Sequence, residues 1–215
     1  MGYARAGFEV YGVDLRPQPN YPFPFVQADA LDFLRFPLVG FAAIHASPPC
    51  QAYSDLKTKV APDAYPRLIE PARELLQASG LPYVIENVEG APLIDPIVLC
   101  GTMFGGLRVI RHRLFESNVK IWAPAHPPGR HPLVFTHDKR KAHYGQLDQD
   151  RSFVQVTGGG NCSIANARAA MGIDWMTKHE LNEAIPPAYA QHVGTQVLHA
   201  IRVDEQAREL EEMAA

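Results

Sequence analysis

The sequence predicts an α/β fold, in which short buried strands alternate with amphipathic helices along the chain. Residues 41–46 and 81–88 are apolar runs without a helical period, and proline or glycine bounds each run, as is common for buried strands. Residues 66–79 instead carry apolar side chains at helical spacing, and Gly80 follows at a position typical of a helix end. Together these patterns favour an open sheet with helices packed against it.

The N-terminal third adds the end of a helix and two further strands. Residues 1–7 are typical of a last helical turn closed by glycine, and residues 8–13 predict a strand that ends at Asp14. Residues 26–29 predict the end of another strand, closed by Asp29. An acid at such a strand end can accept hydrogen bonds from ribose hydroxyls, and the alternative for each Asp is a turn residue or a helix N-cap.

The C-terminal half is predicted to hold one more strand and two helices. Residues 97–104 predict a short strand in which Cys100 serves as a core residue. Residues 177–180 have the spacing of a capping box, and residues 185–201 predict a last amphipathic helix with proline in its first turn. The acidic stretch 204–213 is expected to be a solvated helix face or tail.

Length and composition place the chain among ordinary globular proteins. With 215 residues it is most simply one domain, and 47% hydrophobic and 20% charged content are usual for that class. A net charge of −3 means that any contact with nucleic acid must come from a local basic patch. The three cysteines lack CxxC spacing and the nine histidines contain no HExxH pattern, so we expect neither a disulfide framework nor a metal site. With no signal peptide and no long apolar run, we expect a cytoplasmic protein.

Residues 41–54 contain the first candidate for chemistry. Pro48 and Pro49 end the preceding strand, because proline fixes φ and lacks a backbone donor. Cys50 is therefore held in a stiff loop at the C-terminal edge of the strand, where open α/β sheets bind ligands. A cysteine in this place can act as a nucleophile, and the alternative is a small buried hydrophobic residue.

Two more predicted strands carry polar side chains. Glu86 and Asn87 close the second apolar run, where burial would raise the pKa of the carboxyl toward that of a useful proton donor. The alternative for Glu86 is an internal salt bridge. In a predicted strand over 109–115, Arg111 and Arg113 are two residues apart and share a face, which suits a carboxylate, a phosphate or a carbonyl oxygen.

In this order, the three groups resemble the motifs of the DNA (cytosine-5)-methyltransferases, and most closely the short forms found in phage genomes. The nucleophile motif is matched by residues 47–51 (Ser-Pro-Pro-Cys-Gln), the acid motif by residues 86–88 (Glu-Asn-Val) and the paired-arginine motif by residues 111–113 (Arg-His-Arg). The resemblance runs over most of the chain. It implies a Rossmann-like class I methyltransferase fold that uses S-adenosylmethionine (SAM) as cofactor and double-stranded DNA as partner.

The resemblance also implies a mechanism. The Cys50 thiolate would attack C6 of cytosine and form a covalent adduct, because C5 alone is a poor nucleophile. Glu86 would hydrogen-bond N3 and the exocyclic amine, and Arg113, with Arg111 behind it, would contact the O2 carbonyl. C5 would then take the methyl group from SAM, and loss of its proton would expel the cysteine. On duplex DNA, this chemistry implies base flipping.

Other residues receive roles through the resemblance alone. Asp14 matches the acid that binds the ribose of SAM, Asp29 matches the acid that holds the adenine amine, and Pro48 is expected to contact the cofactor as well. The residues implied for substrate binding are Gln51, Ser54, Asn87 and Arg168. The alternative for the polar segment 51–63 is a plain surface loop.

The sequence departs from the family at its start. The family's first strand and glycine-rich loop, which pass close to the methionine part of SAM, have no counterpart in it. We therefore expect a sheet that lacks its first strand, and weak or no SAM binding unless that segment is restored. Asn182 and Glu183 also stand where the family has Gly-Asn in its last motif.

The resemblance divides the chain into three regions. Residues 1–117 are the catalytic α/β domain, residues 118–153 are a short irregular insertion similar to a target-recognition region, and residues 154–215 return to the catalytic domain. The insertion is rich in proline and carries a basic cluster made of Arg130, His131, Lys139, Arg140, Lys141 and His143. The alternative for the insertion is a disordered surface loop. We expect a monomer.

Two other functions compete with this prediction. The missing strand favours a catalytically inactive DNA-binding relative, and the thiolate chemistry would also suit an enzyme that acts on free pyrimidine nucleotides. The basic insertion favours DNA over a free nucleotide, because an enzyme for mononucleotides needs no such appendage.

Overall fold

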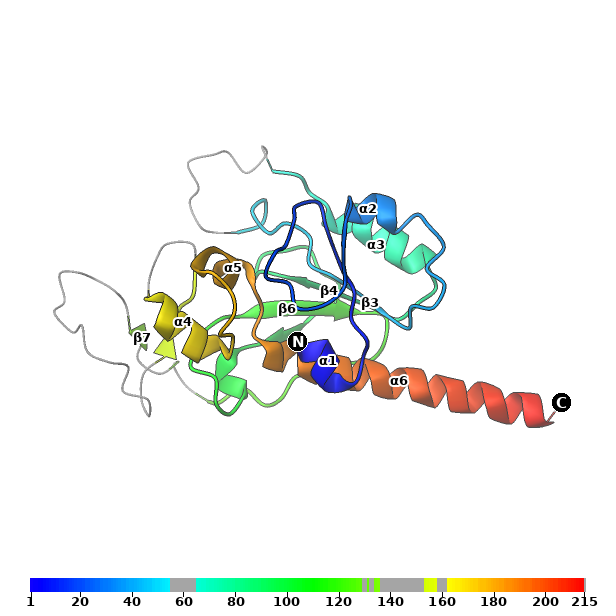
Figure 1. Cartoon of the computed structure of the whole chain (residues 1–215). Helices are drawn as coiled ribbons and strands as arrows, with labels where there is room; N and C mark the ends of the chain where they lie inside the picture. The colour runs from blue at the N-terminus through cyan, green and yellow to red at the C-terminus, as the bar shows by residue number, and fades with distance from the viewer. Residues whose placement is uncertain (55–64, 129–130, 132–133, 136–152, 158–161, 215) are drawn as a thin grey trace.

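Helices and strands alternate over most of the chain, as the sequence predicts (Figure 1). The computed structural model describes all residues except 55–64, 129–130, 132–133, 136–152, 158–161 and 215. The helices are α1 (Gly2–Ala6), α2 (Ala30–Phe33), α3 (Ile69–Ala78), α4 (Ile164–Met171), α5 (Lys178–Glu183) and α6 (Pro187–Ala214), with a 3₁₀ turn η2 (Gly101–Met103). The strands are β1 (Gly12–Asp14), β2 (Phe25–Gln27), β3 (Ile44–Ala46), β4 (Tyr83–Asn87), β5 (Ile97–Leu99), β6 (Arg113–Ser117), β7 (Val134–Phe135) and β8 (Phe153–Val154).

Within the described ranges, the strands form three separately hydrogen-bonded sheets. The largest has the order β3-β4-β6-β5, with β3 parallel to β4 and with β6 antiparallel to both β4 and β5. β1 pairs in parallel with β2, and β7 pairs in parallel with β8. In an open α/β sheet of this type the first strand lies between the strands that correspond here to β1 and β3. The break between β1 and β3 therefore falls where the missing strand was predicted.

β4 is a central strand of the four-stranded sheet, and all five of its residues are buried. Tyr83 and Ile85 cluster with Leu76 of α3, whereas Val84 joins the core on the other side with Phe115 of β6. This alternation follows from the pleat, which turns successive side chains to opposite faces. A strand covered on both faces needs a continuous apolar run, which is why the sequence predicts it clearly.

α6 packs against both the core and the start of the chain. Tyr189 and Val197 from its first half lie in the main core cluster, and α1 lies alongside it (Figure 1). Gly2 permits this approach, because a Cβ atom there would lie 2.3 Å from the carbonyl oxygen of Pro187. Residues 202–214 are exposed, and this end of α6 projects from the body (Figure 1). No helix in the described residues combines the length and the apolarity needed to cross a membrane.

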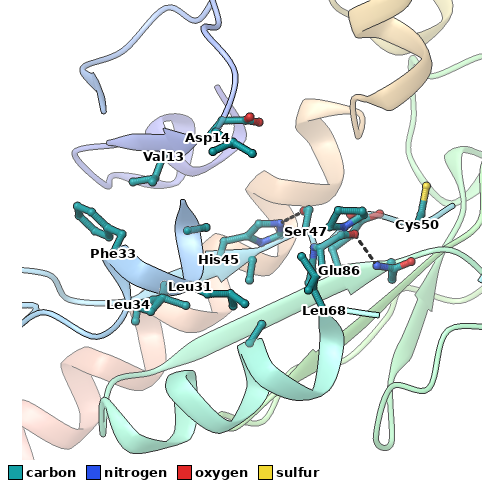
Figure 2. Close-up of a pocket in the computed structure, with 18 of the residues that line it drawn as sticks. Val13, Asp14, Leu31, Phe33, Leu34, His45, Ser47, Cys50, Leu68 and Glu86 are labelled. Carbon is teal, nitrogen blue, oxygen red and sulfur yellow. Dashed lines mark hydrogen bonds between the residues drawn. The ribbon is translucent and has the colours of Figure 1, made fainter. Parts of the chain in front are cut away.

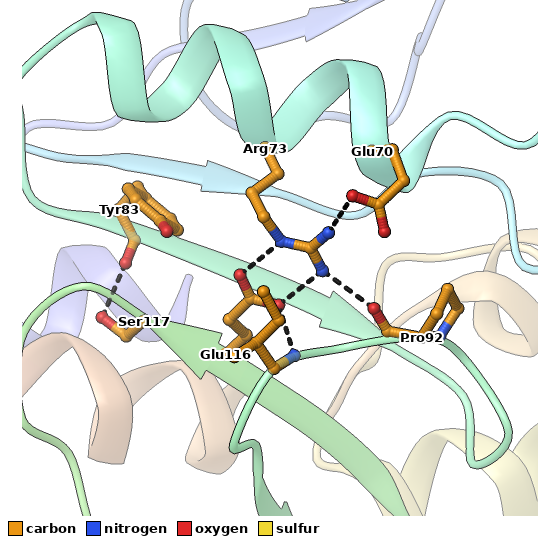
Figure 3. Close-up of polar contacts among 7 residues, drawn as sticks. Glu70, Arg73, Tyr83, Pro92, Glu116 and Ser117 are labelled. Carbon is orange, nitrogen blue, oxygen red and sulfur yellow. Dashed lines mark hydrogen bonds and ion pairs between the residues drawn. The ribbon is translucent and has the colours of Figure 1, made fainter.

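A buried ion pair joins α3 to β6 (Figure 3). Arg73 Nε donates to Glu116 Oε1 at 2.7 Å and Arg73 Nη2 donates to Glu116 Oε2 at 2.8 Å, the two-point geometry of strong arginine–carboxylate pairs. The guanidinium also contacts Glu70 and the Pro92 carbonyl, and the backbone N–H of Ile94 donates to Glu116. The pair fixes the helix that covers β4 to the neighbouring strand.

The strand predicted over 109–115 differs most from the structure. Backbone hydrogen bonds join residues 108–110 to Val154 of β8, and β6 begins only at Arg113. The polar run between these two pairings belongs to neither strand. Arg111 therefore precedes β6, and the prediction that it shares a strand face with Arg113 is wrong.

Most other elements are confirmed with shorter bounds. The strand expected over 41–46 is reduced to β3, and the one over 97–104 is reduced to β5 followed by a 3₁₀ turn. α3 begins at Ile69, which places Pro71 in its first turn, where proline is tolerated. The capping box at 177–180 is present and opens α5.

The proposed insertion is only partly described. Residues 118–128 contain neither helix nor strand, in agreement with their proline content. Most of the predicted basic cluster lies outside the described residues, namely Arg130, Lys139, Arg140, Lys141 and His143. The division of the chain at 118 and 153 stays a prediction.

Candidate active site

A cavity of about 630 Å³ lies at the carboxyl ends of β1, β3 and β4 (Figure 2). This edge is where open α/β sheets bind their ligands, and the volume is within the range of roughly 300–1,000 Å³ common for small-molecule sites. Predicted site residues from several separate segments line it together. They are Asp14, Asp29, Pro48, Cys50, Gln51, Glu86, Asn87, Arg111 and Arg113.

Cys50 lies on a loop that the structure ties to β4. β3 ends at Ala46, and the Asn87 side-chain amide donates a hydrogen bond of 2.9 Å to the carbonyl oxygen of Pro48. A turn bond from Tyr53 N to Cys50 O, 3.0 Å long, closes the loop on its other side. The thiol is half-buried rather than enclosed in the core, so the interpretation of Cys50 as a packed hydrophobic residue does not describe its position. Asn87 thus positions the loop that carries the thiol.

Glu86 is a buried carboxyl paired with Arg113. Glu86 is 7% exposed, and its Oε1 lies 3.0 Å from Arg113 Nε. Burial raises the pKa of Glu86, and the charges of Arg113 and Arg111 with a hydrogen bond from Ser47 reduce the rise without cancelling it. Glu86 therefore makes the internal salt bridge that was the alternative and also has the raised pKa expected of a proton donor.

Arg111 supports the cavity from behind. Its guanidinium donates to the carbonyl oxygens of Val156 and Asn182, the latter at 2.7 Å, and its own carbonyl accepts a bond of 2.7 Å from the Tyr189 hydroxyl. Burial, with the nearby charge of Arg113, lowers the pKa of Arg111 to about 9. These contacts join the segment before β6 to α5 and α6.

A chain of hydrogen bonds leads to Glu86 from Tyr3 and His45, which the sequence analysis did not single out, through Ser47; Figure 2 shows its link between His45 and Ser47. The Tyr3 hydroxyl is 2.8 Å from His45 Nδ1, His45 Nε2 is 2.9 Å from Ser47 Oγ, and Ser47 bonds the Glu86 carboxylate. When Glu86 is ionised it only accepts, so Ser47 then donates to Glu86, His45 Nε2 donates to Ser47, and the Tyr3 hydroxyl donates to His45 Nδ1. Burial lowers the pKa of His45 to about 4, which keeps its ring neutral at pH 7. The sequence signal that could have revealed this chain of hydrogen bonds was a histidine inside the short apolar run 41–46.

Two polar atoms in the cavity wall have no hydrogen-bond partner among the described residues. They are the acceptor Gln51 Oε1 and the donor Arg111 Nε, and both atoms are buried. Buried polar atoms are usually paired, and unpaired ones are typical of positions that a ligand or a water molecule completes. Two residues of the cavity wall thus each hold a buried polar atom that lacks a partner among the described residues.

The far end of the cavity is apolar with two carboxylates. Val13, Leu31 and Phe33 supply the apolar surface (Figure 2). Asp14 accepts bonds from the backbone N–H of residue 16 and from the amide of residue 18, and Asp29 is the N-cap of α2. The N-cap alternative for Asp29 is therefore correct. Each carboxylate still has lone pairs for a ligand, so this end fits a nucleoside-like group.

Ser54 and Arg168 are not among the residues that line the cavity. The Arg168 guanidinium donates two hydrogen bonds, of 3.0 and 2.7 Å, to the carbonyl oxygen of Met176. It thereby ties α4 to the loop that precedes α5. A role in substrate binding stays a prediction for both residues.

Comparisons with known proteins give a structural match. No protein-family model matches the sequence, and no curated protein matches it. The fold is similar to a crystal structure described as a DNA modification methyltransferase encoded within a prophage of E. coli, with a TM-score of 0.61 and 15% sequence identity. The match covers 93% of this chain and 94% of the other. The chain thus has a mixed α/β, Rossmann-like fold similar to that of the matched structure.

Proposed function

We propose that the protein is a DNA cytosine-5 methyltransferase that uses SAM. The observation that carries the proposal is the convergence of Cys50, Glu86 and Arg113 on one cavity, from three separate parts of the chain. A thiol, a carboxyl group of raised pKa and a guanidinium are the groups needed to activate a pyrimidine ring. The similarity of the fold to a protein described as a DNA modification methyltransferase also supports it.

Each of the three side chains has a separate role in the proposed reaction. The Cys50 thiolate would add to C6, and the electron pair of the C5–C6 double bond would move to C5. C5 would then take the methyl group as the sulfonium–methyl bond of the donor breaks, which leaves the donor as a neutral thioether. Glu86 binds N3 and the exocyclic amine, and its raised pKa favours donation of a proton to N3. Arg113 holds Glu86 and offers its remaining N–H groups to O2. Loss of the C5 proton to a base would then re-form the C5–C6 double bond and expel the thiolate, and N3 would return its proton to Glu86.

The proposed cofactor site is the end of the same cavity near Asp14 and Asp29. SAM, when bound there, supplies an electrophilic methyl group. The two carboxylates would hold the ribose and adenine, and Val13 and Phe33 would cover the apolar faces of the nucleoside. Pro48 also lines the cavity and precedes Cys50 by two residues, which suits a position beside both ligands.

The proposed substrate is a cytosine flipped out of duplex DNA. A base inside a duplex cannot reach a thiol that lines a cavity in the protein, so the base must leave the stack. Gln51 follows the proposed nucleophile and lines the same cavity, which supports a role in substrate binding. The net charge of −3 makes local basic patches responsible for phosphate contacts.

The break between β1 and β3 favours a second candidate, a DNA-binding relative without catalysis. In open α/β sheets the loop after the first strand approaches the nucleotide, so its absence from the described sheet would weaken cofactor binding. This candidate shares the DNA partner and differs in predicting no methyl transfer.

Covalent trapping separates the two candidates. A duplex that carries 5-fluorocytosine is incubated with protein and SAM, because fluorine at C5 cannot leave as the proton does and the adduct persists. We expect an adduct that survives denaturing electrophoresis, is lost in Cys50→Ala and is retained in the matched control Cys162→Ala. Wild-type protein that binds the duplex without forming the adduct would support the second candidate, and an adduct that persists in Cys50→Ala would refute the assigned nucleophile.

A further inference from the structure

Four side chains that the proposed reaction does not use converge near the start of β6. Cys100, His112, His126 and His131 each offer one ligand atom, and these four atoms all lie within 4.8 Å of one another. Cys100 Sγ is 3.5 Å from His131 Nε2, and His126 Nε2 is 3.2 Å from His131 Nε2. One sulfur and three nitrogens therefore surround a common point.

The sheet register explains how half of the cluster forms. Leu99 of β5 pairs with Arg113 of β6 in antiparallel register. Cys100 follows Leu99 and His112 precedes Arg113, so the two ligands occupy the next opposed positions beyond the last pair. His126 and His131 come from the proline-rich segment after β6, which returns across this end of the strands.

Two of the distances among the four ligand atoms match those expected around tetrahedral zinc, and the other pairs lie within 4.8 Å. Zinc lies about 2.3 Å from a cysteine sulfur and about 2.0–2.1 Å from a histidine nitrogen. At tetrahedral angles these bond lengths give about 3.5 Å between sulfur and nitrogen, and about 3.3 Å between two nitrogens. The distances of 3.5 Å and 3.2 Å agree with both values.

The groups around the cluster also suit a metal. His126 Nδ1 lies 2.9 Å from the carbonyl oxygen of Pro127, which can only accept, so the proton is on Nδ1 and Nε2 carries the lone pair that a metal would take. Thr102 Oγ1 lies 3.3 Å from this Nε2 and would have to release it. His112 Nδ1 lies 3.4 Å from a Glu89 carboxylate oxygen, and Thr102 Oγ1 is 3.3 Å from Cys100 Sγ. Carbonyl and carboxylate partners on ligating histidines are the usual surroundings of zinc sites.

We propose that Cys100, His112, His126 and His131 bind one Zn²⁺ ion in a closed, structural site. A thiolate with three imidazoles suits zinc rather than magnesium or calcium, and four protein ligands leave no position for a reacting water. This proposal replaces the sequence-based expectation of no metal site. That expectation relied on CxxC and HExxH patterns, whereas the usable signal was the His126–His131 spacing, which fits the H-x₃₋₅-H pattern of zinc sites.

The position of the proposed ion indicates a structural role beside the cavity. His112 lies between Arg111 and Arg113, which both line the cavity. Bound zinc would hold this short segment and attach the chain that follows β6 to the end of β5. It would thus fix the start of the insertion next to the catalytic groups without taking part in the chemistry.

Metal content is the direct test, and it needs neither DNA nor SAM. The full chain, freed of any affinity tag, is exposed to Zn²⁺, desalted and measured by elemental analysis. We expect one zinc per chain in the wild type and in the controls Cys162→Ser and His179→Ala, and loss of most of it in Cys100→Ser and His131→Ala. Zinc well below one equivalent in the wild type, or equal zinc in all variants, would overturn the proposal.

Cobalt substitution keeps the test decisive if a ligand variant fails to fold. Wild-type protein loaded with Co²⁺ should show the intense visible absorption of tetrahedral cobalt together with a sulfur-to-cobalt charge-transfer band. Weak octahedral absorption without that band would overturn the proposal. Because trapping of 5-fluorocytosine reports on Cys50 instead, failure of the zinc proposal leaves the proposed reaction intact.

Discussion

Replacing Arg73 by methionine is expected to destabilise the protein by about 3–5 kcal/mol. Methionine keeps most of the apolar stem but removes both hydrogen bonds from the guanidinium to Glu116. The Glu116 side chain is 4% exposed and would retain the backbone N–H of Ile94 as a partner, which leaves a buried charge largely uncompensated. Glu70 adds little to the cost, because its side chain is 64% exposed and stays hydrated.

Urea unfolding measures this cost. With an m-value of about 2 kcal/mol per M, typical of small domains, the midpoint should fall by roughly 1.5–2.5 M. The double variant Arg73→Met/Glu116→Leu is the control, because it removes the unpaired charge and should recover most of the loss. A single variant that unfolds at the wild-type midpoint would refute the reasoning. A double variant no more stable than the single one would show that lost packing, and not the unpaired charge, sets the cost.

Three further changes follow from the site and the helix contact. Glu86→Gln should slow methyl transfer by roughly 10²–10⁴-fold with an unchanged circular-dichroism spectrum, and retained activity would remove Glu86 from the mechanism. The activity of the wild type should fall as the pH rises through the raised pKa of Glu86, because the proton donor is then lost. Burial lowers the pKa of His45 to about 4 in the folded protein, so between about pH 6.5 and 4 the unfolded chain binds one more proton than the folded one. The free energy of unfolding should therefore fall by about 2 kcal/mol from pH 7 to pH 5. Urea titrations at both pH values should show that His45→Gln lacks this part of the fall. Gly2→Ala places a Cβ atom 2.3 Å from a backbone oxygen of α6 and should lower the free energy of unfolding by roughly 1–3 kcal/mol in thermal unfolding. The control Gly105→Ala meets nothing within 4 Å and should change that free energy by at most about 0.5 kcal/mol. Equal melting temperatures for the two variants would contradict the packing of α1 on α6.

The sequence predicts the buried strands and the loop that carries the thiol, because each depends on neighbours in the chain. The run before Glu86 is apolar on both faces, and Pro48 with Pro49 ends the preceding strand without help from distant residues. The meeting of Cys50 with Glu86 could be predicted only through the order of the motifs. Local patterns fix elements, and the sheet then brings their carboxyl ends together.

Contacts between segments that are far apart in the chain could not be predicted from the sequence. Tyr3 reaches His45 across 42 positions of the chain, and no periodicity links a first-turn residue to a strand histidine. Arg111 was assigned to the wrong strand because the pairing of residues 108–110 with β8 depends on where that distant strand lies. The cluster around Cys100 was not predicted for the same reason, since its ligands come from the ends of two strands and from an irregular segment.

Because one end of α6 projects from the body, the free energy of local opening should differ strongly between the two ends of this helix. Near Val193 and Val197 the helix is held by the core, so its amide protons should exchange with solvent only when the whole domain opens. From residue 203 to residue 214 the residues are exposed, and the Arg208–Asp204 pair on the surface adds little. Deuterium uptake should therefore rise steeply along this single helix, from hours or longer at its anchored start to the fast limit of a fraying peptide at its tip.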